Sequence, residues 1–392
     1  MLKKLQKLDY WIAVPYAALS ALGVVMVFSA SQNAYTSPVA SFLKQLLFVV
    51  VGWLTAFFFF HISVKALKNP RNLQKFMWIT AGLLLIARFM PAVNGAHGWI
   101  RLGSFMTFQP VEMAKLVLIL YFADLLTRYP WYSELPFSRQ IRNWRNRWTL
   151  LFIPAVILAL YLAMPDLGNL FITLVILIVL WMASGVSSRW TFFWVILGAL
   201  ALMFLPELIR MLHLGESSSY AIRRLTNFVN PWQNMDQSRQ LLYSYYAIAR
   251  GGFFGAGLGN SIIKPFLPES NTDFIMAVAT EELGALVVSM VLISLLILIG
   301  RLLYLGIKEK SQYYRLLLFG IAALLLMQAF VNLGGVVGLL PITGVVFPFI
   351  SGGGSSFIVF SVAIGLALNI SAKSRKQVVI NPGDTLARKD LR

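Results

Sequence analysis

The chain has 392 residues, of which 58% are hydrophobic and only 12% are charged. Soluble globular domains carry roughly 25% charged residues, so this composition indicates a polytopic integral membrane protein and excludes an ordinary soluble enzyme. The formal net charge of +18 is assigned to cytoplasmic loops and anionic lipids rather than to nucleic acid, because the lysines and arginines lie between apolar segments.

Ten apolar segments, each near the length that crosses a bilayer, predict an all-α protein with ten transmembrane helices. They cover residues 10–30, 42–60, 74–91, 109–127, 149–164, 168–186, 190–206, 273–305, 315–340 and 355–371. The first segment is longer than the apolar part of a signal peptide, so we expect it to remain as a helix. No internal repeat divides the chain, and we predict a single membrane domain over residues 1–392.

The charges of the loops predict the orientation of the helices. Basic residues cluster after the second, fourth, eighth and tenth segments, whereas residues 32–41 carry no charge. The positive-inside rule then places both termini in the cytoplasm, with residues 373–392 as a cytoplasmic tail. Residues 207–272 are predicted to form a large extracytoplasmic loop, which is too long to be a mere connection and is exempt from the rule by its length.

Asp273 lies where this polar loop meets the eighth apolar segment. A carboxylate at the mouth of a membrane helix requires a partner or a task, and Lys115, near the outer end of the fourth segment, is a candidate partner. A second interpretation pairs Lys115 with Glu112, because residues three apart share one face of a helix. Glu281 and Glu282 follow Asp273 on the same predicted helix, about 12 Å deeper at 1.5 Å per residue.

Other polar groups are expected at the same outer face. Arg101 is suited to bind a phosphate with its forked guanidinium, although snorkelling is an alternative. Asp166, between Pro165 and Gly168, has two interpretations. It is either an ordinary turn residue or a second carboxylate that faces the same outer cavity as Asp273. Consecutive backbone N–H groups over residues 352–356 would cradle an anion.

The sequence contains few candidate metal ligands. It has no cysteine, which excludes disulfides and thiolate zinc sites, and none of its three histidines has metal-ligand spacing; His97 is interpreted as an interfacial residue. A divalent cation, Mg²⁺ or Mn²⁺, on a pyrophosphate substrate is compatible with the chemistry, since hard cations favour oxygen ligands. The sequence does not specify where such a cation would bind.

Several motifs carry a family resemblance. They are the segments 98–103 (GWIRLG), 108–115 (FQPVEMAK), 165–168 (PDLG), 267–274 (LPESNTDF) and 347–356 (FPFISGGGSS). At these motifs the chain closely resembles the SEDS family of cell-wall proteins, which includes FtsW, RodA and SpoVE. Residues 93–99, with the end of the first segment, are most similar to the FtsW branch of Gram-positive bacteria. The chain departs from the family pattern at Gly352, usually a larger residue, and at Asn169, usually threonine.

The resemblance implies a peptidoglycan glycosyltransferase of the bacterial cytoplasmic membrane that polymerises lipid II during cell division. Its implied partners are a class B penicillin-binding protein, which is a transpeptidase, and other division or elongation proteins. We expect the contact with the transpeptidase near the eighth and ninth segments, where Gly284, Gly300 and Gly320 offer small-residue surfaces.

The resemblance also assigns roles to residues. The catalytic aspartate of the family falls on Asp273 and its essential cations on Arg101 and Lys115. Asp273 would act as a general base, with inversion to a β-1,4 linkage and release of undecaprenyl pyrophosphate, since pyrophosphate needs charge neutralisation more than a general acid. The residues expected to bind substrate are Arg101, Glu112, Lys115, Asp166, Lys264, Glu269, Ser351, Gly353 and Ser355.

Two alternatives from other classes remain open. The chain would suit a lipid II flippase if Glu281 and Glu282 lined a polar path through the bundle. It would suit a noncatalytic division scaffold if its task were to recruit the transpeptidase. The concentration of candidate groups at the outer face favours the enzyme, because a transporter distributes polar groups on both sides of the midplane.

Overall fold

The computed structural model of the chain describes residues 8–32, 37–91, 98–103, 106–130, 147–186 and 238–380, together with residue 139 and short pieces between 189 and 235. This part of the chain is mostly helical. Its helices are α2 (Tyr10–Ala30), α3 (Pro38–His61), α4 (Val64–Leu67), α5 (Pro70–Phe89), α6 (Pro110–Arg128), α8 (Trp148–Ala163), α9 (Leu167–Ala183), α12 (Arg239–Gly251), α13 (Ile275–Lys308), α14 (Gln312–Val336) and α15 (Gly354–Ile380). Two short strands, β1 (Ile100–Leu102) and β2 (Met106–Phe108), pair antiparallel.

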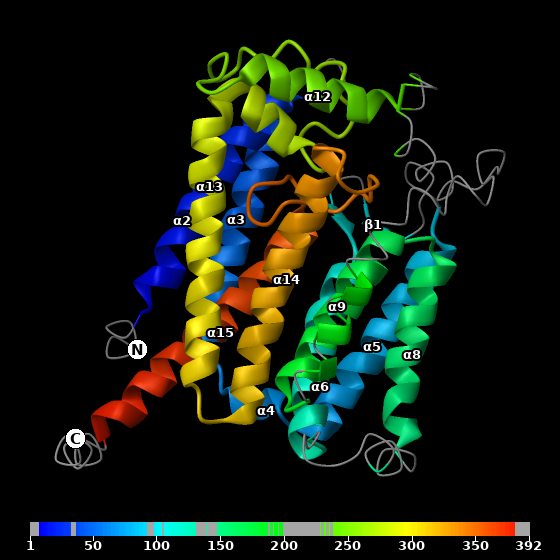
Figure 1. Cartoon of the computed structure of the whole chain (residues 1–392), viewed down its shortest axis with the longest axis vertical. Coiled ribbons are helices and arrows are strands. Elements are labelled where there is room, and N and C mark those ends of the chain that lie inside the picture. The colour runs from blue at the N-terminus through cyan, green and yellow to red at the C-terminus, as the bar shows by residue number, and fades with distance from the viewer. Residues whose placement is uncertain are drawn as a thin grey trace.

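The long helices run side by side as one bundle, and α12 lies across one end of it (Figure 1). The beginning of the described chain lies at the opposite end, beside the inner turns of α13 and α15. There the Asp9 carboxylate accepts hydrogen bonds from the Arg301 guanidinium at 2.8–3.1 Å and from the Ser371 hydroxyl at 2.7 Å. The start of α2 and the last part of α15 therefore lie at the same end of the bundle.

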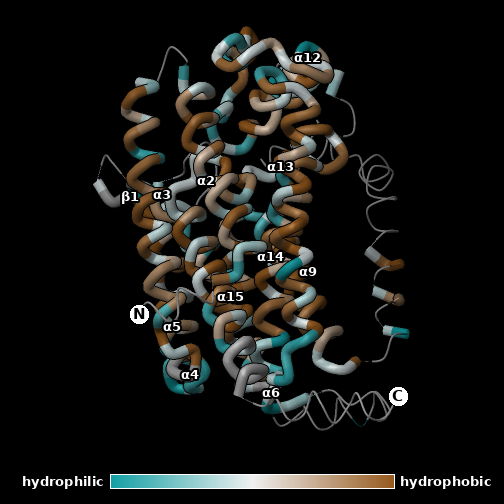
Figure 2. Tube along the Cα trace, turned by 90° about the vertical axis from the view of Figure 1, so that its left-hand side faces the viewer, coloured by the Kyte–Doolittle hydropathy of each residue, from teal (hydrophilic) through white to brown (hydrophobic). Residues whose placement is uncertain are grey.

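Five of the described helices are long and apolar enough to cross a membrane: Tyr10–Ala30, Pro38–His61, Ile275–Lys308, Gln312–Val336 and Gly354–Ser374. Hydrophobic residues dominate the length of the bundle, and hydrophilic residues gather near α12 and near α4 (Figure 2). The chain is thus a polytopic membrane protein. The seventh predicted segment, 190–206, is described only in short pieces.

Only residues 238–272 of the predicted large loop are described continuously, and they contain an unexpected helix. Helix α12 is amphipathic: Leu241, Leu242 and Ala247 are buried toward the bundle, whereas Tyr246 is exposed. The apolar face covers the ends of α13 and α14, where Ser244 donates a hydrogen bond to the Val336 carbonyl at 2.8 Å. This end of the loop is therefore a packed cap.

Helix α13 is broken at Gly284, where φ is 80°. The residues directly after α12 bind the backbone that the break leaves without helical partners. The N–H groups of Ala285 and Leu286 donate to the carbonyls of Gly252 and Phe253 at 3.0 and 3.1 Å. A Cβ at Gly284 would lie 2.4 Å from the Gly255 nitrogen, so only glycine permits both this φ and this close approach. The eighth predicted segment is consequently a short outer helix followed by a long membrane helix.

The ninth predicted segment ends earlier than expected, at Val336, and residues 337–353 are not helical. Gly338 and Gly344 have positive φ values in this stretch, and Val345, Val346, Phe347 and Ile350 are buried. Broken backbone at such a place is tolerated when protein surrounds it. Residues 337–353 connect α14 to α15 and contact the turn that carries Asp273.

Candidate functional site

Asp273 lies in a tight turn directly before α13, with a partly buried side chain. The turn begins at Glu269, whose φ of 55° is unusual for a residue with a side chain. The N–H groups of Thr272 and Phe274 both donate to the Glu269 carbonyl at 3.1 Å, and the Thr272 hydroxyl donates to the Glu269 carboxylate at 2.7 Å. Glu269 is thus the residue that closes the turn around Asp273.

The turn is held from outside by the nonhelical segment between α14 and α15. The Ser351 hydroxyl donates to the Thr272 carbonyl at 2.7 Å, and the Gly352 N–H donates to the Asn271 carbonyl at 2.8 Å. From α14, the Asn332 amide donates to the Asp273 carbonyl at 2.7 Å. The backbone on each side of the candidate base is therefore bound by residues distant in sequence.

Lys115 is buried, with 1% of its surface exposed, and does not pair with Asp273. Its ammonium donates to the Glu112 carboxylate at 2.8 Å, to the Asn169 amide oxygen at 2.8 Å and to the Gln328 amide oxygen at 2.7 Å. An ammonium has three donors, and all three are used here. The predicted Lys115–Asp273 pair is wrong, and the alternative pairing with Glu112 is confirmed, because residues three apart on α6 meet without any help from the tertiary fold.

Asp166 extends this network toward the outer turn between α8 and α9. It caps α9 by accepting a hydrogen bond from the Asn169 N–H at 3.1 Å, and its carboxylate also accepts from the Asn169 amide at 2.9 Å. Burial raises the pKa of the Asp166 carboxyl, while the Asn169 hydrogen bonds and the charge of Lys115 act in the opposite direction. Asn169, the departure from the family pattern, is thus the link between Asp166 and Lys115.

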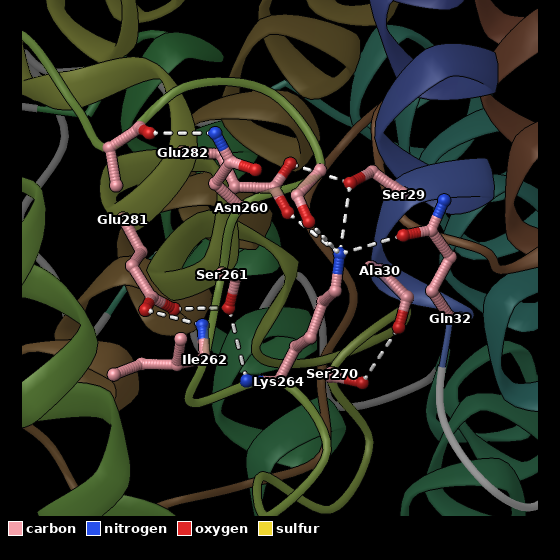
Figure 3. Close-up of polar contacts among 12 residues, drawn as sticks. Ser29, Ala30, Gln32, Asn260, Ser261, Ile262, Lys264, Ser270, Glu281 and Glu282 are labelled. Atoms are coloured by element: carbon pink, nitrogen blue, oxygen red, sulfur yellow. Dashed lines mark hydrogen bonds and ion pairs between the residues drawn. The ribbon is translucent and has the colours of Figure 1, made fainter.

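Lys264 was expected to bind substrate, but it is buried, with 3% of its surface exposed, in a second cluster of polar contacts that includes Ser29 and Glu282 (Figure 3). Its ammonium forms a salt bridge with Glu282 at 3.0 Å and contacts the Ser29 hydroxyl at 3.4 Å and the Gln32 side chain at 3.2 Å. A direct role in substrate binding does not fit this environment, because the charge is already neutralised inside the protein. Lys264 instead ties the segment after α12 to the end of α2.

Glu281 has the same kind of role. It pairs with Arg250 at 2.7 Å, accepts a hydrogen bond from the Ser261 hydroxyl, and accepts one from the Ile262 N–H at 3.1 Å. Glu281 and Glu282 lie on the short first part of α13, before the break at Gly284. Their carboxylates contact residues 261–264, which follow α12 in the chain. They do not continue down a straight membrane helix as the sequence suggested.

Three members of this cluster, Ser29, Arg250 and Ser261, were not among the predicted site residues. The sequence did contain an indication of the two cations, because Glu281 and Glu282 lie in an apolar segment and each requires a positively charged partner. Arg250 and Lys264 precede them closely in the chain.

The predicted anion cradle over residues 352–356 is wrong for its first two N–H groups. The Gly352 N–H binds the Asn271 carbonyl and the Gly353 N–H binds the Ser351 carbonyl, both at 2.8 Å. Ser355 is buried and its hydroxyl accepts a hydrogen bond from the Gln109 N–H at 3.3 Å. These groups connect the turn, the start of α6 and the start of α15, because buried backbone groups are bound internally wherever partners lie within reach.

Arg101 is exposed on β1, opposite Thr107 of β2. Strand β2 leads into α6 through Gln109, whose N–H binds Ser355 at the start of α15. The hairpin therefore presents Arg101 at the same end of the bundle as the Asp273 turn. His97 lies outside the described residues.

Metal ligands are not clustered in the described residues: no group of three or more histidine, aspartate or glutamate side chains is placed to hold a metal ion there. The described site consists of one turn with the carboxylates of Glu269 and Asp273, one exposed guanidinium and two buried ion networks. A reaction that needs one base and nearby positive charge is within the reach of this set.

Comparison with known proteins gives consistent matches over nearly the whole chain. The profile of the FtsW/RodA/SpoVE family, described as cell cycle protein, matches residues 10–376. The probable peptidoglycan glycosyltransferase FtsW of Lactococcus lactis is 36% identical, over 96% of this chain and 96% of that protein. The FtsW of Bacillus subtilis is 34% identical, over 95% of this chain and 92% of its own length.

Solved structures agree. A chain from a study titled "Structural coordination of polymerization and crosslinking by a peptidoglycan synthase complex" is similar with a TM-score of 0.71 and 27% identity, covering 93% of this chain and 97% of that chain. The rod shape determining protein RodA of Thermus thermophilus has a TM-score of 0.62 and 25% identity, covering 93% of this chain and 96% of that chain.

Proposed function

This chain belongs to the FtsW/RodA/SpoVE family of cell cycle proteins, and from this membership we propose that it is a peptidoglycan glycosyltransferase that polymerises lipid II. The observation that carries the proposal within the structure is the turn at residues 269–274, which holds the partly buried Asp273 carboxylate directly before α13. The turn is bound by Ser351, Gly352 and Asn332 from segments distant in sequence. Such preorganisation is expected of a group that must meet a reacting hydroxyl.

In the proposed reaction, Asp273 accepts the proton of the acceptor 4-hydroxyl as that oxygen attacks the anomeric carbon of the donor sugar. The bond to undecaprenyl pyrophosphate breaks, and the lipid pyrophosphate leaves with its electron pair. Displacement with a single base inverts the α-linked donor and forms a β-1,4 linkage. One carboxylate suffices because pyrophosphate is a good leaving group, in contrast to glycosidases with two opposed carboxyls.

Positive charge for the pyrophosphate is assigned to Arg101, supplemented by a divalent cation, Mg²⁺ or Mn²⁺. Arg101 is exposed at the outer end, and its forked guanidinium matches phosphate geometry. The roles of the other residues expected to bind substrate are revised because their polar groups are hydrogen-bonded inside the protein. We propose that Glu112, Lys115, Asp166, Lys264, Ser351, Gly353 and Ser355 shape the site from within, while Glu269 closes the turn.

The proposed topology has ten transmembrane helices with both termini in the cytoplasm and the active site facing outside. Residues 1–392 form one membrane domain, 207–272 an extracytoplasmic loop and 373–392 a cytoplasmic tail. The position of the start of α2 and the last part of α15 at one end of the bundle supports this arrangement. So do the basic residues Lys308 at the end of α13, Lys310 just after it and Lys373 in the last part of α15.

We further propose that the protein acts with a class B penicillin-binding protein in cell division. Polymerised strands need crosslinks, and a related structure comes from a complex that coordinates polymerisation with crosslinking. The flippase alternative loses its main support, since Glu281 and Glu282 are both engaged in salt bridges. A scaffold with no chemistry gives no reason for the bound turn at Asp273.

Purified lipid II tests the function directly. The detergent-purified protein, alone and with its class B partner, should convert lipid II into glycan polymers that a muramidase digests. In proteoliposomes, translocation of fluorescent lipid II without any polymer in either preparation would refute the enzyme and support the flippase. Absence of both activities would leave the scaffold as the better account.

A further inference from the structure

We propose that Asn332 on α14 is a positioning residue for Asp273, an inference that rests on the proposed glycosyltransferase function. Asn332 is buried, with 4% of its surface exposed, and its amide donates to the Asp273 carbonyl at 2.7 Å and to the Val345 carbonyl at 2.8 Å. It thereby joins the turn that carries the base to the segment that surrounds it. No feature of the sequence singled out Asn332.

The geometry shows why this contact matters for the carboxylate. The direction of a Cα–Cβ bond depends on the two rigid peptide planes that flank the Cα atom. The plane after Asp273 is bound at both ends, because Asn332 holds the Asp273 carbonyl and the Glu269 carbonyl holds the Phe274 N–H at 3.1 Å. The plane before it is bound through the Thr272 carbonyl by Ser351 at 2.7 Å. The backbone therefore aims the Asp273 side chain.

The orientation of the Asn332 amide follows from its partners. Both contacts are with carbonyl oxygens, which only accept, so the NH₂ group must face them. Its own carbonyl oxygen is buried without a hydrogen-bond partner within the described residues. The Asn332 side-chain oxygen stays unpaired in the described part of the chain while the NH₂ group donates to the carbonyls of Asp273 and Val345. These two donated hydrogen bonds are therefore the contribution of Asn332 to the structure.

Helix α14 also connects this contact with the buried lysine. Gln328 lies one turn before Asn332 and accepts a hydrogen bond from Lys115 at 2.7 Å. One face of α14 therefore holds both the Asp273 backbone and the Lys115–Glu112 pair. A change at Lys115 would therefore reach the backbone of Asp273 through α14, without a contact between the two side chains.

The chain contains a matched control. Asn369 on α15 is buried to a similar degree, with 5% of its surface exposed, and its amide donates to the carbonyls of Phe59 and Ile62 at 2.8 and 2.6 Å. It lies with the inner end of α3, far from the turn. Asn369→Ala and Asn332→Ala each remove an amide that donates to two backbone carbonyls, so they should cost the fold similar stability.

Steady-state kinetics with purified lipid II separate the two variants. Asn332→Ala should lower kcat about 10- to 100-fold with KM nearly unchanged, because small misplacements of a reacting group carry costs of this size. Asn369→Ala should retain the kcat of the folded wild-type enzyme. Ser351→Ala, which frees the Thr272 carbonyl, should reproduce the kcat loss and serves as the test if Asn332→Ala does not accumulate.

A double variant decides between positioning and mere stability. In the Asp273→Asn background, measured in long incubations, Asn332→Ala should cause little further loss, because its effect acts through the carboxylate. The same fold-loss in both backgrounds, a raised KM with unchanged kcat, or an equal kcat loss in Asn369→Ala would each overturn the inference. A wild-type enzyme that makes no polymer with its partner would instead refute the proposed function, and the inference with it.

Discussion

Two kinds of charged residue occur at the described site, exposed groups and buried lysines whose ammonium groups are hydrogen-bonded inside the protein. Arg101 and Glu269 belong to the first kind. Lys115 and Lys264 belong to the second, and each has a glutamate within 3.0 Å. A buried lysine whose hydrogen bonds are all made inside the protein stabilises the packing of the segments that it joins. The partly buried Asp273 therefore remains the group best placed to act on substrate.

Asp273→Asn should lower polymerisation of lipid II by about 10²–10⁴-fold, the range expected for a lost general base. The change is nearly isosteric, and the backbone contacts of Asp273 do not involve its side chain, so the fold and the partner complex should persist. Glu309→Gln, at the inner end of α13, removes a carboxylate far from the turn and provides the control. Near-normal polymer from purified Asp273→Asn protein would exclude the base assignment.

Lys115→Met should destabilise the protein by about 3 kcal/mol, because it leaves the Glu112 carboxylate buried and uncompensated. Thermal unfolding in detergent should show a lower midpoint for Lys115→Met and a substantial recovery for Lys115→Met combined with Glu112→Gln. This expected coupling replaces the coupling with Asp273 that the sequence suggested. A double variant no more stable than Lys115→Met would contradict the pairing as the main role of Glu112.

At the level of elements, the break in α13 is the feature on which the outer end depends. Gly251, Gly255 and Gly284 allow backbone to contact backbone, and the two flanking ion pairs hold the segment below α12 against the break. The glycines expected to contact the partner transpeptidase are not all available on the surface. Gly284 is packed against Gly255 and Gly320 against Ile119, whereas Gly300 has open space.

Gly284→Ala should destabilise the protein strongly, by more than the roughly 1–3 kcal/mol of an unfavourable backbone conformation, since its Cβ would also meet backbone atoms. Gly300→Ala is the matched control on the same helix. It meets nothing within 4 Å and should stabilise by up to about 1 kcal/mol through helix propensity. Equal unfolding midpoints for the two variants would show that the break is not required.

For the whole molecule, the start of the described chain and the packed cap of α12 lie at opposite ends of the bundle (Figure 1), which the proposed topology takes as its inner and outer ends. The proposed ten-helix topology follows from these ends together with the loop charges. The buried Asp9–Arg301 pair also ties the start of α2 to the inner part of α13. Ion pairs therefore lie at both ends of the bundle, and the Asp9–Arg301 pair joins elements distant in sequence.

The absence of cysteine from the chain makes the topology directly measurable. In intact cells, a membrane-impermeant maleimide should label Gly259→Cys, in the exposed segment below α12, and should label Lys310→Cys only after permeabilisation. Both positions are surface-exposed in the described structure, so accessibility depends on the side of the membrane. Labelling of Lys310→Cys in intact cells would reverse the proposed orientation.

The amino-acid sequence by itself determined the membrane class, the helical character, the positions of the main apolar segments and Asp273 as the candidate base. These features are local: apolar runs, loop charges and polar motifs act over a few residues, so they can be interpreted without the fold. It also contained the Glu112–Lys115 pair as one of two alternatives, because that pair lies within a single helix.

Only the tertiary structure decided the partners of the other buried charges, the break in α13 and the contacts of the Asp273 turn. Lys264 meets Glu282 and Ser29, and Asn332 meets Asp273, because helices far apart in sequence pack together. Helical periodicity says which side chains share a face of one helix, but it does not say which neighbour that face meets. Partner choice in a membrane bundle is therefore set by packing, where each buried polar group must find its hydrogen bonds inside the protein.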